Sequence, residues 1–369
     1  MTKEVSSPLP DQHTAQIETV RSSMDVVYNW NYEPEIDELR TLYVNAVDGQ
    51  WSAVKQLDWD AEIDHAAFSR SFSIGGIPIT QTEFWKTLSE ETQWQMSRRT
   101  AAFMLSTFLH GEQGALMTAS QLVAAVPHMD GKFYAATQTM DEARHVEVFA
   151  AYVKKLDIVY PIGTGLKAIL DAILAADDWR HKAVGMNIVL EGLALYSFRE
   201  MRNQTEEPLL KKLLTYVARD EARHTAYGIK YLGRMSSELS PEERAGIEDF
   251  AFEAARQLID QRTGNAMRGP IMKIWADAGI DPMEAIASLM KERELLSQSM
   301  ESETRLGPVH GFVVPTLKSI GLYSDRIRGH FKDMWAANLG AKNAERMATF
   351  DANLPKDLDE WVNDGYETL

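Results

Sequence analysis

The chain has 369 residues, of which 45% are hydrophobic and 25% charged, and its formal net charge is −16. These values suit a folded protein with a large core, and the acidic balance argues against nucleic acid or an anionic membrane as a partner. Cysteine is absent, which excludes disulfides, thiolate ligands and iron–sulfur clusters. No uncharged apolar run of about 18 residues and no signal-like N-terminal stretch occur, so we expect a soluble, cytoplasmic protein.

Residues 1–92 are expected to form an N-terminal arm and helices that wrap over the core. Residues 1–33 contain two prolines and few periodic apolar positions, which predicts a flexible or loosely packed arm. Residues 35–51 then show an apolar stripe at helical spacing, and residues 73–78 read as a linker.

Residues 93–236 are expected to form a bundle of four long helices. Apolar periodicity and the breaks between periodic segments place these helices near 93–126, 132–156, 179–202 and 207–235. A short helix at 166–175 fits in the long connection between the second and the third. We therefore expect one long crossover, which places the second helical hairpin antiparallel to the first.

Residues 237–369 are expected to form a C-terminal helical extension that packs on the bundle. The helices are predicted near 241–267, 270–278, 282–299, 325–338 and 340–350, with breaks at Gly307-Pro308 and at Pro315. The sequence contains no convincing strand and no glycine-rich phosphate loop, so the predicted fold class is all-α.

The pentapeptide DEARH occurs twice, at residues 141–145 and again 79 positions later at residues 220–224. In each copy the glutamate and the histidine are three residues apart, which places both side chains on one face of a helix. A carboxylate and an imidazole on one face form half of a metal site. The repeat therefore predicts two matching half-sites.

A further glutamate completes each half-site. Glu112 precedes Glu142 by 30 residues, and Glu191 precedes Glu221 by the same distance. A helix-breaking segment lies halfway between the two glutamates of each pair, so both glutamates of a hairpin return to the same height.

Four glutamates and two histidines that converge in a bundle are a ligand set for two divalent metal ions. The four negative charges balance two divalent cations, which makes burial tolerable. Oxygen and imidazole donors suit iron or manganese, and the sequence does not separate the two metals, so a mixed Mn/Fe pair stays open. The candidate metal ligands, which are also the candidate catalytic residues, are Glu112, Glu142, His145, Glu191, Glu221 and His224.

These motifs resemble those of the ferritin-like non-haem diiron carboxylate superfamily. The similarity covers about residues 93–236 and is strongest to the hydroxylase subunits of bacterial multicomponent monooxygenases and to ribonucleotide reductase small subunits. It implies that Glu142 and Glu221 bridge two irons, with one of the histidines on each iron. The same resemblance implies that Asp141 and Asp220 accept the free ring N–H of the histidine on the opposite motif.

The two arginines of the motifs, Arg144 and Arg223, would neutralise these aspartates. The alternative is that the aspartates and arginines form exposed ion pairs, because both residue types are commonly found at the surface.

Three positions depart from particular relatives. The threonine that monooxygenase hydroxylases carry is replaced by Leu195, and the tyrosine of the radical-forming reductases by Phe149. The additional histidine of diiron arylamine N-oxygenases is replaced by Val217. The resemblance therefore does not select a subfamily.

Four apolar residues lie about one turn from the ligands and are candidates for a substrate pocket: Phe108, Leu116, Phe149 and Leu195. The same residues would equally serve as bundle core.

The function that follows is an O₂-dependent diiron oxygenase that hydroxylates or N-oxygenates a small organic substrate. The expected partners are dioxygen, the small molecule, and an external reductase or ferredoxin that supplies electrons, and the resemblance implies a homodimer. Two alternatives remain open: a ferritin-like iron-handling protein, and a radical-generating subunit like that of ribonucleotide reductase. The long C-terminal extension argues against the first, and Phe149 argues against the second.

Overall fold

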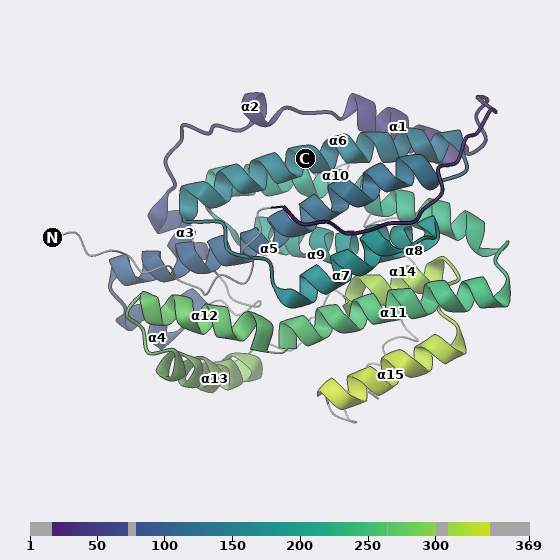
Figure 1. Ribbon diagram of the computed structural model, residues 1–369. Coiled ribbons are helices and arrows are strands. Elements are labelled where there is room, and N and C mark those ends of the chain that lie inside the picture. The colour runs from purple at the N-terminus through teal and green to yellow at the C-terminus, as the bar shows by residue number, and fades with distance from the viewer. Residues whose placement is uncertain (1–16, 73–78, 264, 300–308, 340–369) are drawn as a thin grey trace.

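The computed structural model describes residues 17–72, 79–263, 265–299 and 309–339. Within these residues all regular structure is helical and no strand occurs, which confirms the predicted all-α class (Figure 1). The long helices form the predicted four-helix bundle, and additional helices lie before and after it. No helix among the described residues has an apolar stretch long enough to cross a membrane.

Two antiparallel hairpins build the bundle. The first pairs α5 (Glu90–Ala125) with α6 (Met129–Leu156), and Pro127 lies in the turn between them. In the second, α9 (Glu191–Gln204) is followed by α10 (Pro208–Ser236). Side-chain caps define two of the helix starts: Ser89 accepts a hydrogen bond from the backbone of Thr92, and Glu207 caps α10 ahead of Pro208.

The crossover between the hairpins contains the predicted short helix, α7 (Thr164–Ala175), and then α8 (Trp179–Ala183). Lys182, which is fully buried, ties the two together because its Nζ donates to the carbonyls of Ile173 and Leu174 at 3.0 and 2.8 Å. These carbonyls belong to the last turn of α7 and carry the negative end of its dipole.

The third bundle helix differs from the prediction of one regular helix over 179–202. Between α8 and α9 the chain forms a π-helix, η2 (Val184–Leu190), all of whose residues are buried. A π-helix widens the turn by one residue and shifts the side chains that follow it around the helix axis. Such a local shift depends on packing and leaves no mark in apolar periodicity.

The N-terminal segment wraps over the bundle. Residues 17–35 contain no helix, and the backbone N–H of Val27 donates to the carbonyl of Ala124 in α5. Next, α1 (Asp37–Asp48) packs its buried face on α6 and α10, as the apolar stripe predicts. Four short elements follow, and they are α2 (Ala53–Gln56), α3 (His65–Ser71), η1 (Ile79–Gln81) and α4 (Glu83–Thr87). The first three were not predicted. The predicted linker at 73–78 lies outside the described residues.

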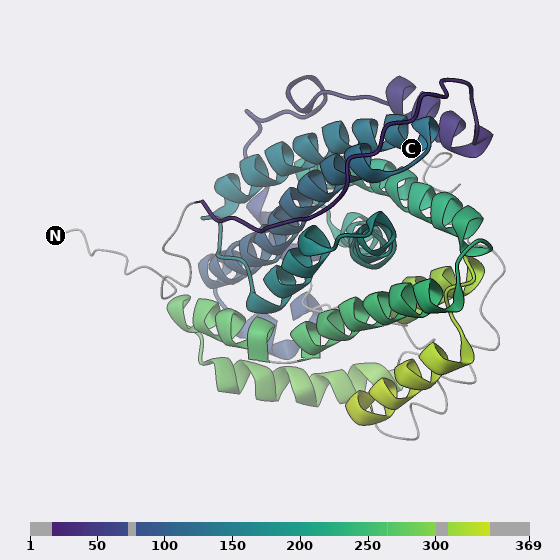
Figure 2. The ribbon, with the colours of Figure 1, turned by 45° about the vertical axis from the view of Figure 1, so that its right-hand side comes forward.

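The C-terminal helices lie on the opposite side of the bundle from α1 and α6 (Figures 1 and 2). They are α11 (Pro241–Thr263), α12 (Asn265–Asp277), α13 (Pro282–Ser299), η3 (Val309–Val313), α14 (Val314–Ser319) and α15 (Asp325–Leu339). The prediction that Pro315 breaks the chain was wrong: it lies within a helical segment in which η3 continues directly into α14. The predicted helix at 340–350 lies outside the described residues.

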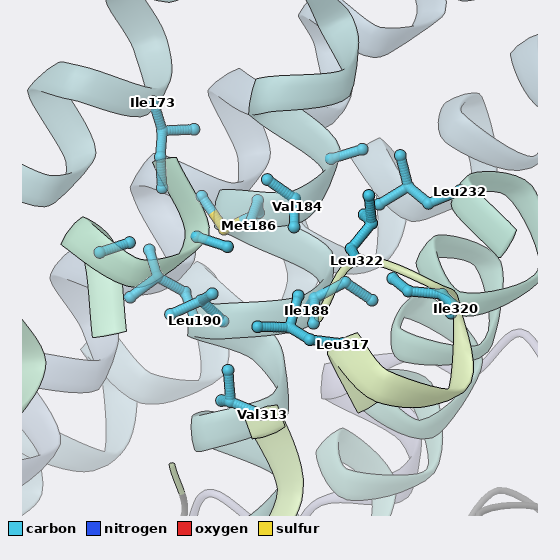
Figure 3. Close-up of a cluster of buried hydrophobic side chains, with 14 of the residues drawn as sticks. Ile173, Val184, Met186, Ile188, Leu190, Leu232, Val313, Leu317, Ile320 and Leu322 are labelled. Carbon is cyan, nitrogen blue, oxygen red and sulfur yellow. The ribbon is translucent and has the colours of Figure 1, made fainter. Parts of the chain in front are cut away.

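The extension shares a core with the bundle. Figure 3 shows side chains of η2, among them Met186 and Ile188, against Leu317, Ile320 and Leu322 from the C-terminal part. Because these residues are buried in one cluster, the C-terminal helices hold the π-helical segment and therefore the start of α9 in place.

Candidate metal centre

The six predicted ligands meet in the interior of the bundle, and each is at most 4% exposed. They come from all four long helices: Glu112 from α5, Glu142 and His145 from α6, Glu191 from α9, and Glu221 and His224 from α10. The first hairpin brings Glu112 and Glu142 into one group, as the spacing predicts.

The ligand atoms fall into two overlapping groups. In the first, single donor atoms of Glu112, Glu142, His145 and Glu221 all lie within 4.8 Å of one another. Glu142, Glu191 and His224 form the second group by the same measure. Glu142 belongs to both groups, and Glu221 Oε2 also lies 3.7 Å from His224 Nδ1. These two glutamates thus stand between the two histidines.

Both histidines turn the same nitrogen toward the carboxylates. His145 Nδ1 lies 3.1 Å from Glu112, 3.2 Å from Glu142 and 3.1 Å from Glu221. His224 Nδ1 lies 3.0 Å from Glu142. Nδ1 is therefore the nitrogen available to a metal ion in each ring.

The other ring nitrogen of each histidine faces an aspartate of the opposite motif. His145 Nε2 is 3.3 Å from Asp220 Oδ2, and His224 Nε2 is 3.3 Å from Asp141 Oδ2. A carboxylate acceptor keeps the proton on Nε2 and leaves Nδ1 free to bind a cation. Contacts with His145 and Arg223 lower the pKa of Asp220 in spite of its burial, so it stays ionised.

The arginines of the motifs are buried beside these aspartates, so the alternative of exposed ion pairs is wrong. Arg144 donates to Asp141 and, at 3.0 Å, to Asp220. Arg223 donates to Asp220 and lies 3.9 Å from Asp141. Two arginines and two aspartates thus form a compact, charge-balanced cluster on the Nε2 side of the histidines.

Two residues of the N-terminal segment complete this cluster and were not predicted. The Nε1–H of Trp51 donates to Asp220 at 2.6 Å, and the amide of Gln50 donates to Asp141 at 2.8 Å. Arg144 in turn donates to Gln50 Oε1 and lies 4.6 Å from the Trp51 ring. No spacing in the sequence links residues 50 and 51 to a motif so far away, so no sequence signal indicates these contacts.

Gln138 and Asn187 were also not predicted, although a signal was present. Gln138 stands four residues before Glu142, and Asn187 four before Glu191, so each lies one helical turn from a ligand. Both are fully buried and donate to Glu191.

The pKa values of the ligand side chains are those expected at a site that binds cations. Burial raises the pKa of Glu112 and of Glu191 well above the ordinary value, and neighbouring glutamates raise both further. Although burial lowers the pKa of His145, its contacts with Asp220 and three glutamates raise it overall. A surplus of buried negative charge that pulls protons onto imidazoles is what divalent metal ions relieve.

Buried ligand atoms without hydrogen-bond partners also indicate that the site holds metal ions. Among the described residues, Glu142 Oε2, Glu221 Oε2 and His224 Nδ1 are buried without a hydrogen-bond partner. Buried polar atoms rarely lack partners. All three belong to the two groups and are oxygen or imidazole donors, which suit iron or manganese.

Phe108, Phe149 and Phe198 form an aromatic layer, and three of the four predicted pocket residues belong to the hydrophobic cluster that contains this layer. The Phe108 ring is 4.8 Å from Phe198 and 6.4 Å from Phe149, and Leu195 and Val217 are buried in the same hydrophobic cluster. Leu116, the fourth residue, is only partly buried and stands outside that cluster.

Comparison with known proteins gives two similarities. A family model described as p-aminobenzoate N-oxygenase AurF matches residues 35–302. A solved structure, a mutant R2-like ligand-binding oxidase with an aerobically reconstituted Mn/Fe cofactor, is 18% identical and has a TM-score of 0.41 over 82% of this chain and 93% of that one. This second similarity is too low to bear on function. No curated protein matches the chain.

Proposed function

The chain belongs to the AurF family of p-aminobenzoate N-oxygenases, and from this premise we propose that it oxygenates the amino group of a small aromatic amine. In this proposal the enzyme is a non-haem diiron oxidoreductase that uses dioxygen. The observation that carries it is the pair of overlapping glutamate–histidine groups buried in the bundle.

The proposed ligands are the six residues of these groups: Glu112, Glu142, His145, Glu191, Glu221 and His224. Glu142 and Glu221 stand between the histidines and are the glutamates able to bridge two ions. Iron is the metal we propose, with manganese or a mixed Mn/Fe pair as the other occupant that this donor set accepts. When bound, the metal pair supplies the reduction of dioxygen and the transfer of one oxygen atom to the substrate.

The residues around the ligands set the protonation of the histidines and balance the buried charge. Asp141 and Asp220 hold the protons of the two imidazoles on Nε2, so both Nδ1 atoms are free to bind a metal ion. Arg144 and Arg223 balance the charge of these buried aspartates.

The aromatic layer is the proposed substrate side. Phe108, Phe149 and Leu195 present apolar surface next to the ligands and exclude water from the reacting amine. An aromatic ring packs favourably against the phenylalanine rings. Leu116 is not included, because it stands outside this layer.

The electron donor in this proposal is a separate reductase or ferredoxin, and the assembly is a homodimer. The chain has no cysteine and thus no thiolate ligand for an iron–sulfur cluster of its own.

The test is single-turnover chemistry on protein loaded anaerobically with Fe(II). Exposure to isotopically labelled dioxygen in the presence of p-aminobenzoate, other arylamines, phenols and alkenes should label the nitrogen of an arylamine. Phe149→Ala should reduce this product, whereas Phe331→Ala, a buried phenylalanine in α15, should not. Label on carbon alone, or on no member of the panel while iron is fully bound, would contradict N-oxygenation.

A further inference from the structure

We propose that Gln138 and Asn187 hold the Glu191 carboxylate in one orientation and thereby make the two metal positions inequivalent. The inference rests on the proposed diiron site and adds an asymmetry within it. In this arrangement the position next to Glu191 is the fixed one. The position next to Glu112 is the adaptable one.

The two amides bind both oxygens of Glu191. Gln138 Nε2 donates to Glu191 Oε1 at 2.6 Å and to Glu142 Oε1 at 3.3 Å, and Asn187 Nδ2 donates to Glu191 Oε2 at 2.9 Å. Asn187 Nδ2 also lies 3.1 Å from Gln138 Oε1, which links the two amides. All three side chains are buried, so no bulk water competes for these hydrogen bonds. A carboxylate held at both oxygens resists rotation about its side-chain bonds.

The backbone places Asn187 for this contact. It lies in the middle of the π-helix, and Glu191 is the first residue after that helix. Gly228 of α10 leaves room for it, because a Cβ there would lie 2.6 Å from Asn187 Cβ. The π-helix and the glycine thus bring the amide between two bundle helices, where Asn187 also reaches the carbonyl of His224 at 3.4 Å.

The internal repeat shows that the other half of the site lacks this pair. Adding 79 to Gln138 gives Val217, and subtracting 79 from Asn187 gives Phe108. The same offset relates Glu191 to Glu112. Neither Val217 nor Phe108 has a side-chain hydrogen-bond donor. At the two places where one half of the site carries amides, the other carries apolar side chains.

Glu112 is consequently held differently. His145 Nδ1, 3.1 Å away, is the hydrogen-bond partner that the described residues offer to its carboxylate. This nitrogen is also a proposed ligand, so the contact is exchanged for a metal bond when the site is loaded. Glu112 is then free to change the way its two oxygens bind. One turn earlier on α5, Phe108 packs against Phe149 and Phe198.

The inference is tested by anaerobic titration of the full chain with Mn(II), followed by calorimetry and by electron paramagnetic resonance. The wild type should bind two ions with unequal affinities. Asn187→Leu, which keeps volume and removes the donor, should weaken one of the two affinities by about 10–100-fold and leave the other within a few-fold. Gln138→Met should weaken the same affinity most, and the other affinity less, because Gln138 also donates to the shared Glu142. Val217→Ala, at the position equivalent to Gln138, should change neither affinity by more than a few-fold.

The outcomes separate this inference from the proposed function. A wild type that binds fewer than two ions would contradict the diiron site itself. Two ions of equal affinity in the wild type would overturn the asymmetry alone, whether or not the variants fold. The asymmetry would also be overturned if variants that fold, as checked by circular dichroism, bind both ions equally more weakly than the wild type or bind neither more weakly.

Discussion

Asp220, in the second DEARH motif, lies 3.3 Å from Nε2 of His145, in the first. The reciprocal contact joins Asp141 to His224 at the same distance. Each motif therefore supplies a metal ligand of its own and the proton acceptor for the ligand of the other. This exchange explains why the motif is repeated as a block of five residues and not only as a glutamate and a histidine.

Asp220→Asn should weaken metal binding by about 10–100-fold without unfolding the protein. The neutral amide is a poorer acceptor for the Nε2–H of His145, so the tautomer that frees Nδ1 is less favoured. Asp130→Asn is the matched control, because Asp130 is equally buried but accepts from Glu35, Ile36 and Arg40, away from the ligands. Calorimetric titration with Fe(II) or Mn(II) measures the effect, and equal affinities in the two variants would contradict it.

Glu142→Ala should abolish the metal pair, because Glu142 belongs to both ligand groups. His110→Gln should leave two ions bound, since His110 Nε2 contacts the carbonyl of Tyr160 and not the cluster. Metal analysis after anaerobic loading and desalting distinguishes the two. A Glu142→Ala protein that retains two ions would show that this glutamate is not shared.

Gly131→Ala should destabilise the protein by about 1–3 kcal/mol through overcrowding. A Cβ at residue 131 would lie 2.7 Å from the ring of Tyr231. That ring cannot easily retreat, because it stacks on Trp179 at 4.8 Å and its hydroxyl lies 2.9 Å from His128 Nδ1. Gly111→Ala, also within a bundle helix but with nothing within 4 Å of the new Cβ, should instead stabilise by up to about 1 kcal/mol. Chemical denaturation measures both, and equal effects would contradict the packing argument.

The stability of the wild type relative to Lys182→Met should rise with pH between about 8 and 10.5. Burial lowers the pKa of Lys182 from 10.5 to about 8 in the folded protein. In that interval the unfolded lysine still holds its proton and the folded one has lost it. Deprotonation therefore favours the folded state, by at most about 1.4 kcal/mol per pH unit. Free energies of unfolding across this range test the claim, and a flat difference would contradict it.

The sequence by itself determined the class of fold and the residues that converge. Glutamate and histidine three residues apart lie on one helix face whatever surrounds the helix, because that follows from helical periodicity. The repeat offset and the midpoint breaks then identified Glu112 and Glu191, and the structure brings both to the cluster. Apolar stripes also placed α1 and the long bundle helices to within a few residues.

Only the tertiary structure decided what surrounds these ligands. Trp51 reaches Asp220 from 169 positions away in the chain, and such a contact depends on how the N-terminal segment packs. The π-helix depends in the same way on tertiary packing, because Leu317 and its neighbours pack against its buried side chains. Through that helix Asn187 meets Glu191. Local periodicity is a property of each helix alone, whereas these contacts arise from the free energy of packing several helices together.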